Sequence, residues 1–304
     1  MRTDIRAYLH PSYVGSLAGH GSPRRLTNSG GWILEREIPG SHRRDAMGPY
    51  PVFCCDDWHG LAADLDELRD SGFVSVVAVT DPMLDAATPA ELGAFDVARP
   101  FKTHYLTDLT VPSEQAVSGH HRSCVRRAAR KLDWDRPHDT PAHLEEWCAL
   151  YEHLAARHAI TGLRRFSVEA FRAMLALPGA ILMRALYQGK VVGAQLFLIH
   201  DNVAHAHLAA FDETGYRLGA SYLLDWAALD ELRHRVRYIN WGGGAGLAET
   251  DTSGLAQYKQ GWATDRRITY LLGSILDRAA YNRLTGLDNA DSSYFPAYRT
   301  GEFG

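Results

Sequence analysis

Three consecutive strands joined by tight turns constrain the fold of this chain more than any other segment. The strands cover residues 180–187, 190–200 and 203–211. The turns between them are the pairs Gln188-Gly189 and Asp201-Asn202. Two-residue turns of this kind close hairpins, because glycine and asparagine accept the left-handed backbone that such turns need. We therefore predict an antiparallel three-strand meander.

The rest of the chain mixes helix and strand signals. After the meander we predict helices over 221–235, 253–260 and 275–284, and strands over 237–241 and 267–272. Before it we predict strands over 31–38, 50–55, 74–80 and 103–110, and helices over 59–71, 118–132, 142–159 and 167–176. Strands mixed with helices along the whole chain predict an α/β fold. The charged stretch 133–141 holds two prolines and is the best candidate for a linker.

Length and composition exclude several classes of protein. The 304 residues suffice for about two domains, and 46% apolar residues exclude wholesale disorder. A net charge of −4 excludes a generally basic nucleic-acid coat, although not a local basic patch. The longest strongly apolar run, 73–79, is too short to span a membrane, and residues 1–15 show no signal-peptide pattern. Four cysteines without CxxC spacing suggest reduced thiols, so we expect a cytoplasmic protein.

The predicted helix 118–132 carries an unusual line of positive charge. Arg122, Arg126 and Arg130 are spaced four apart and share one face, with Arg127 and Lys131 beside them. Like charges at this spacing repel each other. Either the face is simply solvated, or an anionic partner such as phosphate compensates the repulsion.

Four segments together carry a resemblance to a known family. They are His120-His121-Arg122 running into Val125–Ala128, Ala220–Trp226, Ile239–Gly243, and Tyr258-Lys259-Gln260-Gly261-Trp262. The set resembles the FemABX group, the peptidoglycan bridge-forming aminoacyltransferases within the GNAT acyltransferase superfamily. The resemblance spans about residues 118–272.

This resemblance implies a fold and a domain organisation. We expect two fused GNAT-like halves, with mixed sheets flanked by helices, around a central cleft. We expect a degenerate N-terminal domain at 1–135 and a C-terminal domain at 142–304. About 30 residues at the end of the chain are expected to pack back on the N-terminal domain.

The segment around Lys259 is the predicted donor-binding site. Lysine is scarce here, since only Lys102, Lys131, Lys190 and Lys259 occur among 32 basic residues. A cation between Tyr258 and Trp262, after the glycine run at Gly242 and Gly243, suits a phosphate or carboxylate held close to backbone. The alternative is a surface lysine beside core aromatic residues. The second predicted set binds phosphate, tRNA or the acceptor and comprises Arg122, Arg126, Arg127, Arg130, Lys102 and Tyr222.

Two histidines are the predicted catalytic residues. Amide formation requires removal of a proton from the attacking amine, and an imidazole is suited to accept it. His205 and His207 share one face of the last meander strand, where the resemblance implies that ligands enter. The alternative is a pair of structural histidines. His120, His121 and Cys124 lack a fourth ligand at regular spacing, so we expect no metal.

The expected reaction transfers an aminoacyl group from aminoacyl-tRNA to the amine of a small molecule or peptidoglycan precursor, without a further cofactor. One alternative is an acetyl-CoA-dependent N-acetyltransferase. However, residues 215–220 depart from the Arg/Gln-x-x-Gly-x-Gly/Ala loop with which many such enzymes hold pyrophosphate. Another alternative is a GNAT-like module that binds a ligand without catalysis.

Overall fold

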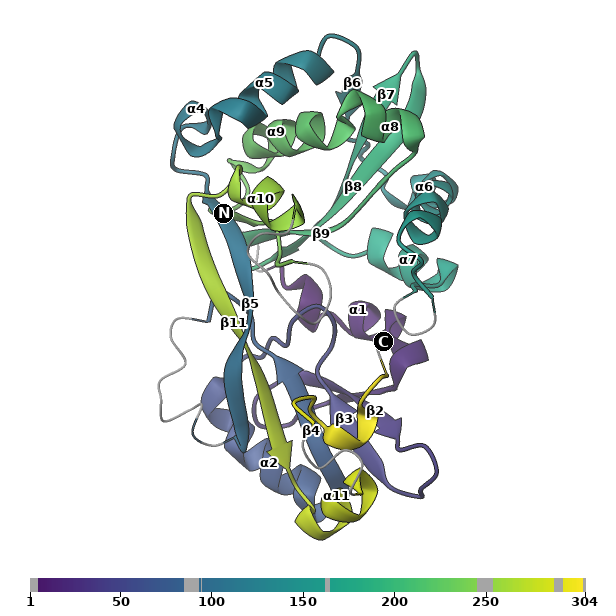
Figure 1. Ribbon diagram of the computed structural model, residues 1–304, viewed down its shortest axis with the longest axis vertical. Helices are drawn as coiled ribbons and strands as arrows, with labels where there is room; N and C mark the ends of the chain where they lie inside the picture. Colours follow the sequence, from purple (N-terminus) through teal and green to yellow (C-terminus); the bar gives the residue numbers. More distant parts are fainter. Residues whose placement is uncertain are drawn as a thin grey trace. The chain divides into compact units, whose positions relative to one another are not determined.

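The computed structural model describes residues 5–84, 93, 95–161, 165–244, 254–286 and 292–302. Two compact units share the chain. Unit 1 comprises Met1–Ala7 and Lys102–Arg267, and unit 2 comprises Tyr8–Phe101 and Ile268–Gly304. The long strands β5 (Val97–Asp108) and β11 (Asp265–Ile275) each contribute residues to both units (Figure 1).

Unit 1 is built on a mixed sheet in the order β5-β10-β9-β8-β7-β6. Its further strands are β6 (Asp133–Asp135), β7 (Ala180–Tyr187), β8 (Lys190–His200), β9 (Val203–Phe211) and β10 (Tyr238–Asn240). Strands β7, β8 and β9 form the predicted meander with the predicted bounds. Gln188, Gly189 and Asp201 have the positive φ angles that close such hairpins.

Helices cover both faces of this sheet. They are α4 (Ser113–Ala116), α5 (Gly119–Ala128), α6 (Leu144–Arg157), α7 (Val168–Leu175), α8 (Glu213–Leu218), α9 (Ala220–Leu232) and α10 (Gly254–Gln260). Helix α9 packs across β7, β8 and β9 and against α5, whereas α6 and α7 lie on the other side of the meander (Figure 1). Ile181, Met183 and Ala185 of β7 join Leu224 and Ala228 of α9 in one buried core. Among the described residues, no helix is long and apolar enough to cross a membrane.

Unit 2 is built on strands that neighbour one another in the order β1-β2-β3-β4-β11, in parallel and antiparallel pairs. Its strands before β11 are β1 (Ser22–Arg25), β2 (Trp32–Glu37), β3 (Arg44–Met47) and β4 (Phe73–Val79). Its helices are α1 (Pro11–Ser16), α2 (Leu61–Asp70) and α11 (Arg278–Thr285). The α/β class with mixed sheets flanked by helices is therefore confirmed.

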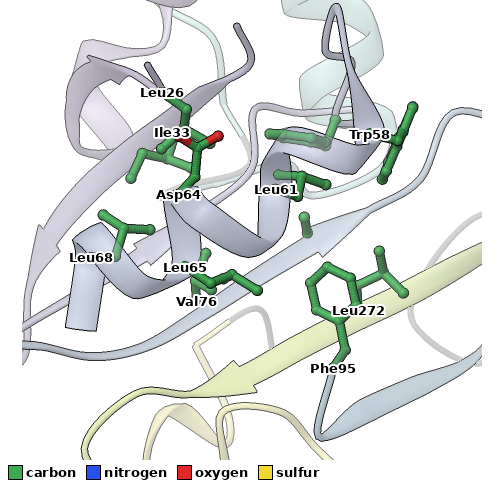
Figure 2. Close-up of a pocket in the computed structure, with 12 residues that line it drawn as sticks. Leu26, Ile33, Trp58, Leu61, Asp64, Leu65, Leu68, Val76, Phe95 and Leu272 are labelled. Atoms are coloured by element: carbon green, nitrogen blue, oxygen red, sulfur yellow. The ribbon is translucent and has the colours of Figure 1, made fainter. Parts of the chain in front are cut away.

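A small cavity lies inside unit 2, between helix α2 and the sheet (Figure 2). Leu61, Leu65 and Leu68 of α2 line it. Its volume is about 30 Å³, room for about two water-sized groups at most. The Asp64 carboxylate on its wall already accepts the backbone N–H groups of Asn28 and Ser29. We interpret the cavity as a packing void rather than a binding site.

The structure corrects two expectations. Residues 50–55 form no strand, apart from a single bridge between Phe53 and Thr80, because Pro51 has no N–H to donate to a ladder. The predicted linker 133–141 begins with β6, which pairs with β7 inside unit 1. The borders of the compact units therefore lie near residues 101 and 267 rather than at 135–142, and Ile268–Gly304 joins Tyr8–Phe101.

Candidate functional site

The candidate site lies in unit 1, where strands β9 and β10 part. They pair in parallel over three residues, ending at Asn240 beside His205, whereas β9 continues to Phe211. After β10 the chain runs into Gly242–Gly244, which we call the glycine strand end. Points in an α/β sheet where neighbouring strands stop bonding to each other are common ligand sites.

Two of the four lysines meet at the glycine strand end. The Lys259 ammonium donates to the carbonyl of Gly243 over 2.6 Å, and the Lys102 ammonium donates to the carbonyl of Gly244 over 2.9 Å. Gly242 has a φ of 78°, and a Cβ added there would lie 3.2 Å from the Lys259 nitrogen. The structure thus brings together Lys102, Lys259, Gly242 and Gly243, which the sequence assigned to two separate sets.

Four rings pack together behind Lys259 and form what we call the aromatic cluster: His121, Tyr222, Tyr258 and Trp262. The His121 ring centre lies 5.0 Å from Trp262, 5.1 Å from Tyr222 and 5.3 Å from Tyr258. A Cβ added to Gly261 would lie 2.2 Å from the His121 ring, so only glycine fits there. Two of the segments that carry the family resemblance therefore meet in one contact.

Both nitrogens of His121 have partners. Nδ1 lies 2.9 Å from the Ser118 hydroxyl, and Nε2 lies 2.9 Å from the carbonyl oxygen of Tyr258. A carbonyl only accepts, so Nε2 carries the proton and Nδ1 accepts from Ser118. His121 is thus engaged in hydrogen bonds that a zinc ligand would lose. Beside it, the Cys124 sulfur lies 3.6 Å from Nε2 of His120.

The buried carboxylate of Asp225 is hydrogen-bonded to a member of the aromatic cluster. Asp225 of helix α9 is 3% exposed and accepts the Tyr258 hydroxyl over 2.5 Å. Burial raises the pKa of Asp225 to about 7, although the hydrogen bonds from Tyr258 and Gln195 and the nearby Lys259 charge oppose this shift. Sequence analysis does not detect this pair, because residues 225 and 258 share no spacing that local periodicity can reveal.

On the opposite face of the sheet, Asn240 bridges two buried histidines. Its Oδ1 accepts the Gly242 N–H over 2.9 Å, which sets the orientation of the amide. Its Nδ2 then lies 3.1 Å from Nδ1 of His104 and 3.2 Å from Nδ1 of His205. Because Nδ2 only donates, His205 accepts at Nδ1 and carries its proton on Nε2. Nδ1 of His104 also lies 3.2 Å from Oδ1, so it bonds to either atom of the amide.

The burial of these histidines affects their pKa values, and His205 is one of the two predicted catalytic bases. Burial and neighbouring imidazoles lower the pKa of His205 well below its usual value, while burial and the Lys259 charge lower the pKa of His104 to about 3. Burial also lowers the pKa of His207 to about 3. The catalytic roles of His205 and His207 stay predictions.

The basic helix α5 is only partly available to a partner. Arg122 donates to the carbonyls of Glu114 and Val117, so it holds the preceding turn instead of facing outward. Arg126 and Arg127 of α5 are exposed, as is Arg130, which follows the end of α5 at Ala128. Arg127 also contacts the Cys124 sulfur over 3.6 Å. The helix joins the site through His121, whose ring belongs to the aromatic cluster.

The segment that corresponds to a pyrophosphate loop is folded into a helix. Helix α8 begins directly after β9, and its N-terminal residue Asp212 accepts the Gly215 N–H over 2.7 Å. Gly219, with a φ of 76°, then separates α8 from α9. The helix that follows residues 215–220 is α9, and no side chain caps its N-terminus at Gly219. Residues 215–218 belong to helix α8 and so do not form an open loop before α9.

Comparisons with known proteins define the class. Residues 119–260 match the family model described as the acetyltransferase (GNAT) domain. No curated protein matches the sequence significantly. The fold is similar to that of FemX, with a TM-score of 0.68 at 13% identity over 90% of this chain and 95% of that chain.

Two further solved structures share the fold. One is the C-terminal domain of a putative lysylphosphatidylglycerol synthetase from Agrobacterium fabrum, with a TM-score of 0.61 at 16% identity over 92% of this chain and 89% of that chain. The other is L-PGS from Bacillus licheniformis, with a TM-score of 0.58 at 13% identity over 91% and 95%. Residues 119–260 thus match a GNAT domain, and the fold of the chain is similar to that of FemX and of these two structures.

Proposed function

We propose that this acyltransferase moves an aminoacyl group from aminoacyl-tRNA to the amine of a small molecule or peptidoglycan precursor. The amine nitrogen attacks the ester carbonyl, a C–N bond forms, and the C–O bond to the terminal ribose breaks. The proton lost by the amine ends on the leaving ribose oxygen, so no further cofactor is needed. The reaction belongs in the cytoplasm, where charged tRNA is present.

The structure of residues 215–220 is the observation that carries this choice of donor. These residues depart from the pyrophosphate-binding loop, and residues 215–218 are folded into helix α8, which argues for a donor with a different phosphate arrangement. The exposed arginines of α5 suit the backbone of an RNA acceptor stem. Lys259 and Lys102 at the glycine strand end suit an anionic part of the donor close to the reacting ester.

The description of the matched domain favours a second candidate, an acetyl-CoA-dependent N-acetyltransferase. A third is a module that binds its ligand in the same place without catalysis. The three differ in the donor that they consume.

A side-by-side transfer assay distinguishes them. The full chain is incubated with tRNA charged with a radiolabelled amino acid or with radiolabelled acetyl-CoA, together with a panel of amines and peptidoglycan precursors. We expect label to move from charged tRNA only. Transfer from acetyl-CoA alone would establish the second candidate. Binding of charged tRNA without transfer to any amine would establish the third.

A further inference from the structure

Asp225 is a buried carboxyl group without a basic partner. Among the described residues, no ion pair joins it to an Arg or Lys side chain, in contrast to the buried Asp45, which pairs with Arg36 and Arg299. Its partners are the hydroxyl of Tyr258 and the side chain of Gln195. Because an acid in this position destabilises the fold, it calls for a functional reason.

Tyr258 is held at both ends. Its hydroxyl donates to Asp225, and its backbone carbonyl accepts from His121. Helix α10 has only seven residues, too few to be stable alone, so its position depends on such contacts. The hydrogen bond to Asp225 ties α10 to helix α9.

Lys259 follows Tyr258 directly, and its ammonium lies 2.6 Å from the carbonyl of Gly243. A rotation of α10 that moves Tyr258 also moves Lys259 by a similar amount. We propose that Asp225 is a positioning residue, which holds Lys259 at the glycine strand end through Tyr258. The contact between Lys259 and the donor rests on the proposed function. The link from Asp225 through Tyr258 to the position of Lys259 does not.

The link is expected to depend on pH. Above its pKa of about 7, the Asp225 carboxylate accepts a charge-assisted hydrogen bond from Tyr258; below it, this bond weakens. The other groups that face this pair are Tyr222, Lys259 and His121. Burial raises the pKa values of Tyr222 and Tyr258 and lowers the pKa of His121, so Asp225 is the group of this set that titrates near pH 7.

Competitive labelling of lysines tests the link without any transfer reaction. The chain has four lysines, and Lys131 and Lys190 are exposed and serve as internal references. The full chain is labelled briefly with a trace of acetic anhydride, and the label on each lysine is quantified by mass spectrometry. We expect Asp225→Asn and Tyr258→Phe each to raise labelling of Lys259, relative to the references, on the order of 3- to 10-fold. Asp230→Asn, an exposed acid on the same helix, should change nothing.

The pH dependence gives a second measurement. In the wild type, relative labelling of Lys259 should rise as pH falls from 8 to 6, and in Asp225→Asn it should stay flat. Unchanged labelling of Lys259 in both Asp225→Asn and Tyr258→Phe, with melting temperatures that show both variants to be folded, would overturn the proposal. So would a wild-type profile without a step near pH 7.

Transfer kinetics then connect the link to the reaction. Where charged tRNA is the donor, Asp225→Asn should lower kcat/KM in the wild-type background and have no further effect in Lys259→Met. An equal decrease in both backgrounds would show that Asp225 acts by another route. If the wild type transfers nothing, the proposed function fails, whereas the labelling result still decides the role of Asp225.

Discussion

Each unit contains a buried aspartate that accepts hydrogen bonds from side chains, and the two carboxylates have different partners. Asp45 of unit 2 is 0% exposed and accepts from Arg36 over 3.1 Å, from Arg299 over 2.5 Å and from the Tyr298 hydroxyl over 3.0 Å. Asp225 of unit 1 is 3% exposed and has only uncharged donors, Tyr258 and Gln195.

The different partners indicate different roles for the two buried carboxylates: Asp45 stabilises the fold, and Asp225 serves the function. Two guanidinium groups compensate the Asp45 charge, so this carboxylate ties the C-terminal segment that carries Arg299 to strands β2 and β3. Asp225 has no such compensation, and its pKa of about 7 leaves it able to exchange a proton near neutral pH. Changes around Asp45 should therefore alter stability, and changes around Asp225 and Lys259 should alter transfer.

The largest expected effect is on Asp45. Asp45→Ala removes one of the two carboxylates that the buried Arg36 and Arg299 share, the other being Glu302, so the free energy of unfolding should fall by about 3–5 kcal/mol. Urea denaturation measures this change, with Asp66→Ala, an exposed acid on α2, as the matched control. A decrease no greater than that of Asp66→Ala would mean that Asp45 and Asp225 are equivalent after all.

The pH dependence of stability should set Asp225 apart. Because folding raises the pKa of Asp225 from 3.8 to about 7, the folded state binds the proton more tightly than the unfolded state. The stability of the wild type is therefore full below pH 4 and falls as pH rises to 7. Between pH 5 and 8, Asp225→Asn should gain about 2–3 kcal/mol relative to the wild type. Denaturation curves at several pH values measure this gain, and parallel curves for the two proteins would contradict the prediction.

Lys259 should affect transfer without affecting stability. Lys259→Met keeps most of the apolar stem and removes the charge, so we expect kcat/KM for charged tRNA to fall about 10- to 150-fold. Lys190→Met, at the exposed first residue of β8, is the control. Near wild-type transfer at subsaturating donor would remove Lys259 from the site.

The smallest effect is expected on helix α5. Arg122 is bonded to backbone carbonyls, so the exposed Arg126 and Arg130 provide the cleaner test. Arg126→Ala with Arg130→Ala should reduce the slope of log binding constant against log salt by about 0.7–0.9 for each phosphate that is no longer neutralised. The control removes the same charge elsewhere, with Arg69→Ala and Arg172→Ala. Equal slopes for both double variants would show that the α5 face is merely solvated.

The sequence predicted the scaffold of unit 1 better than its site. The meander was predicted with its observed bounds, because alternating side chains and turn pairs such as Gln188-Gly189 are local signals. The convergence of Lys259 and Lys102 on neighbouring carbonyls of the glycine strand end was not foreseen, since it depends on which strands are neighbours. Likewise, Asn240 had no predicted role, although it is hydrogen-bonded to both His104 and His205.

By itself, the sequence determined where helices and strands form and which segments carry the family resemblance, because backbone preferences and side-chain periodicity act between near neighbours. Tertiary structure decided which of these residues meet and in which protonation state. Asp225 is an ordinary acid in the sequence, and only burial beneath Tyr258 raises its pKa toward 7. His205 is a candidate base in the sequence, and only Asn240 places the proton on its Nε2. Desolvation and long-range hydrogen bonds depend on the assembled fold, so no local pattern encodes them.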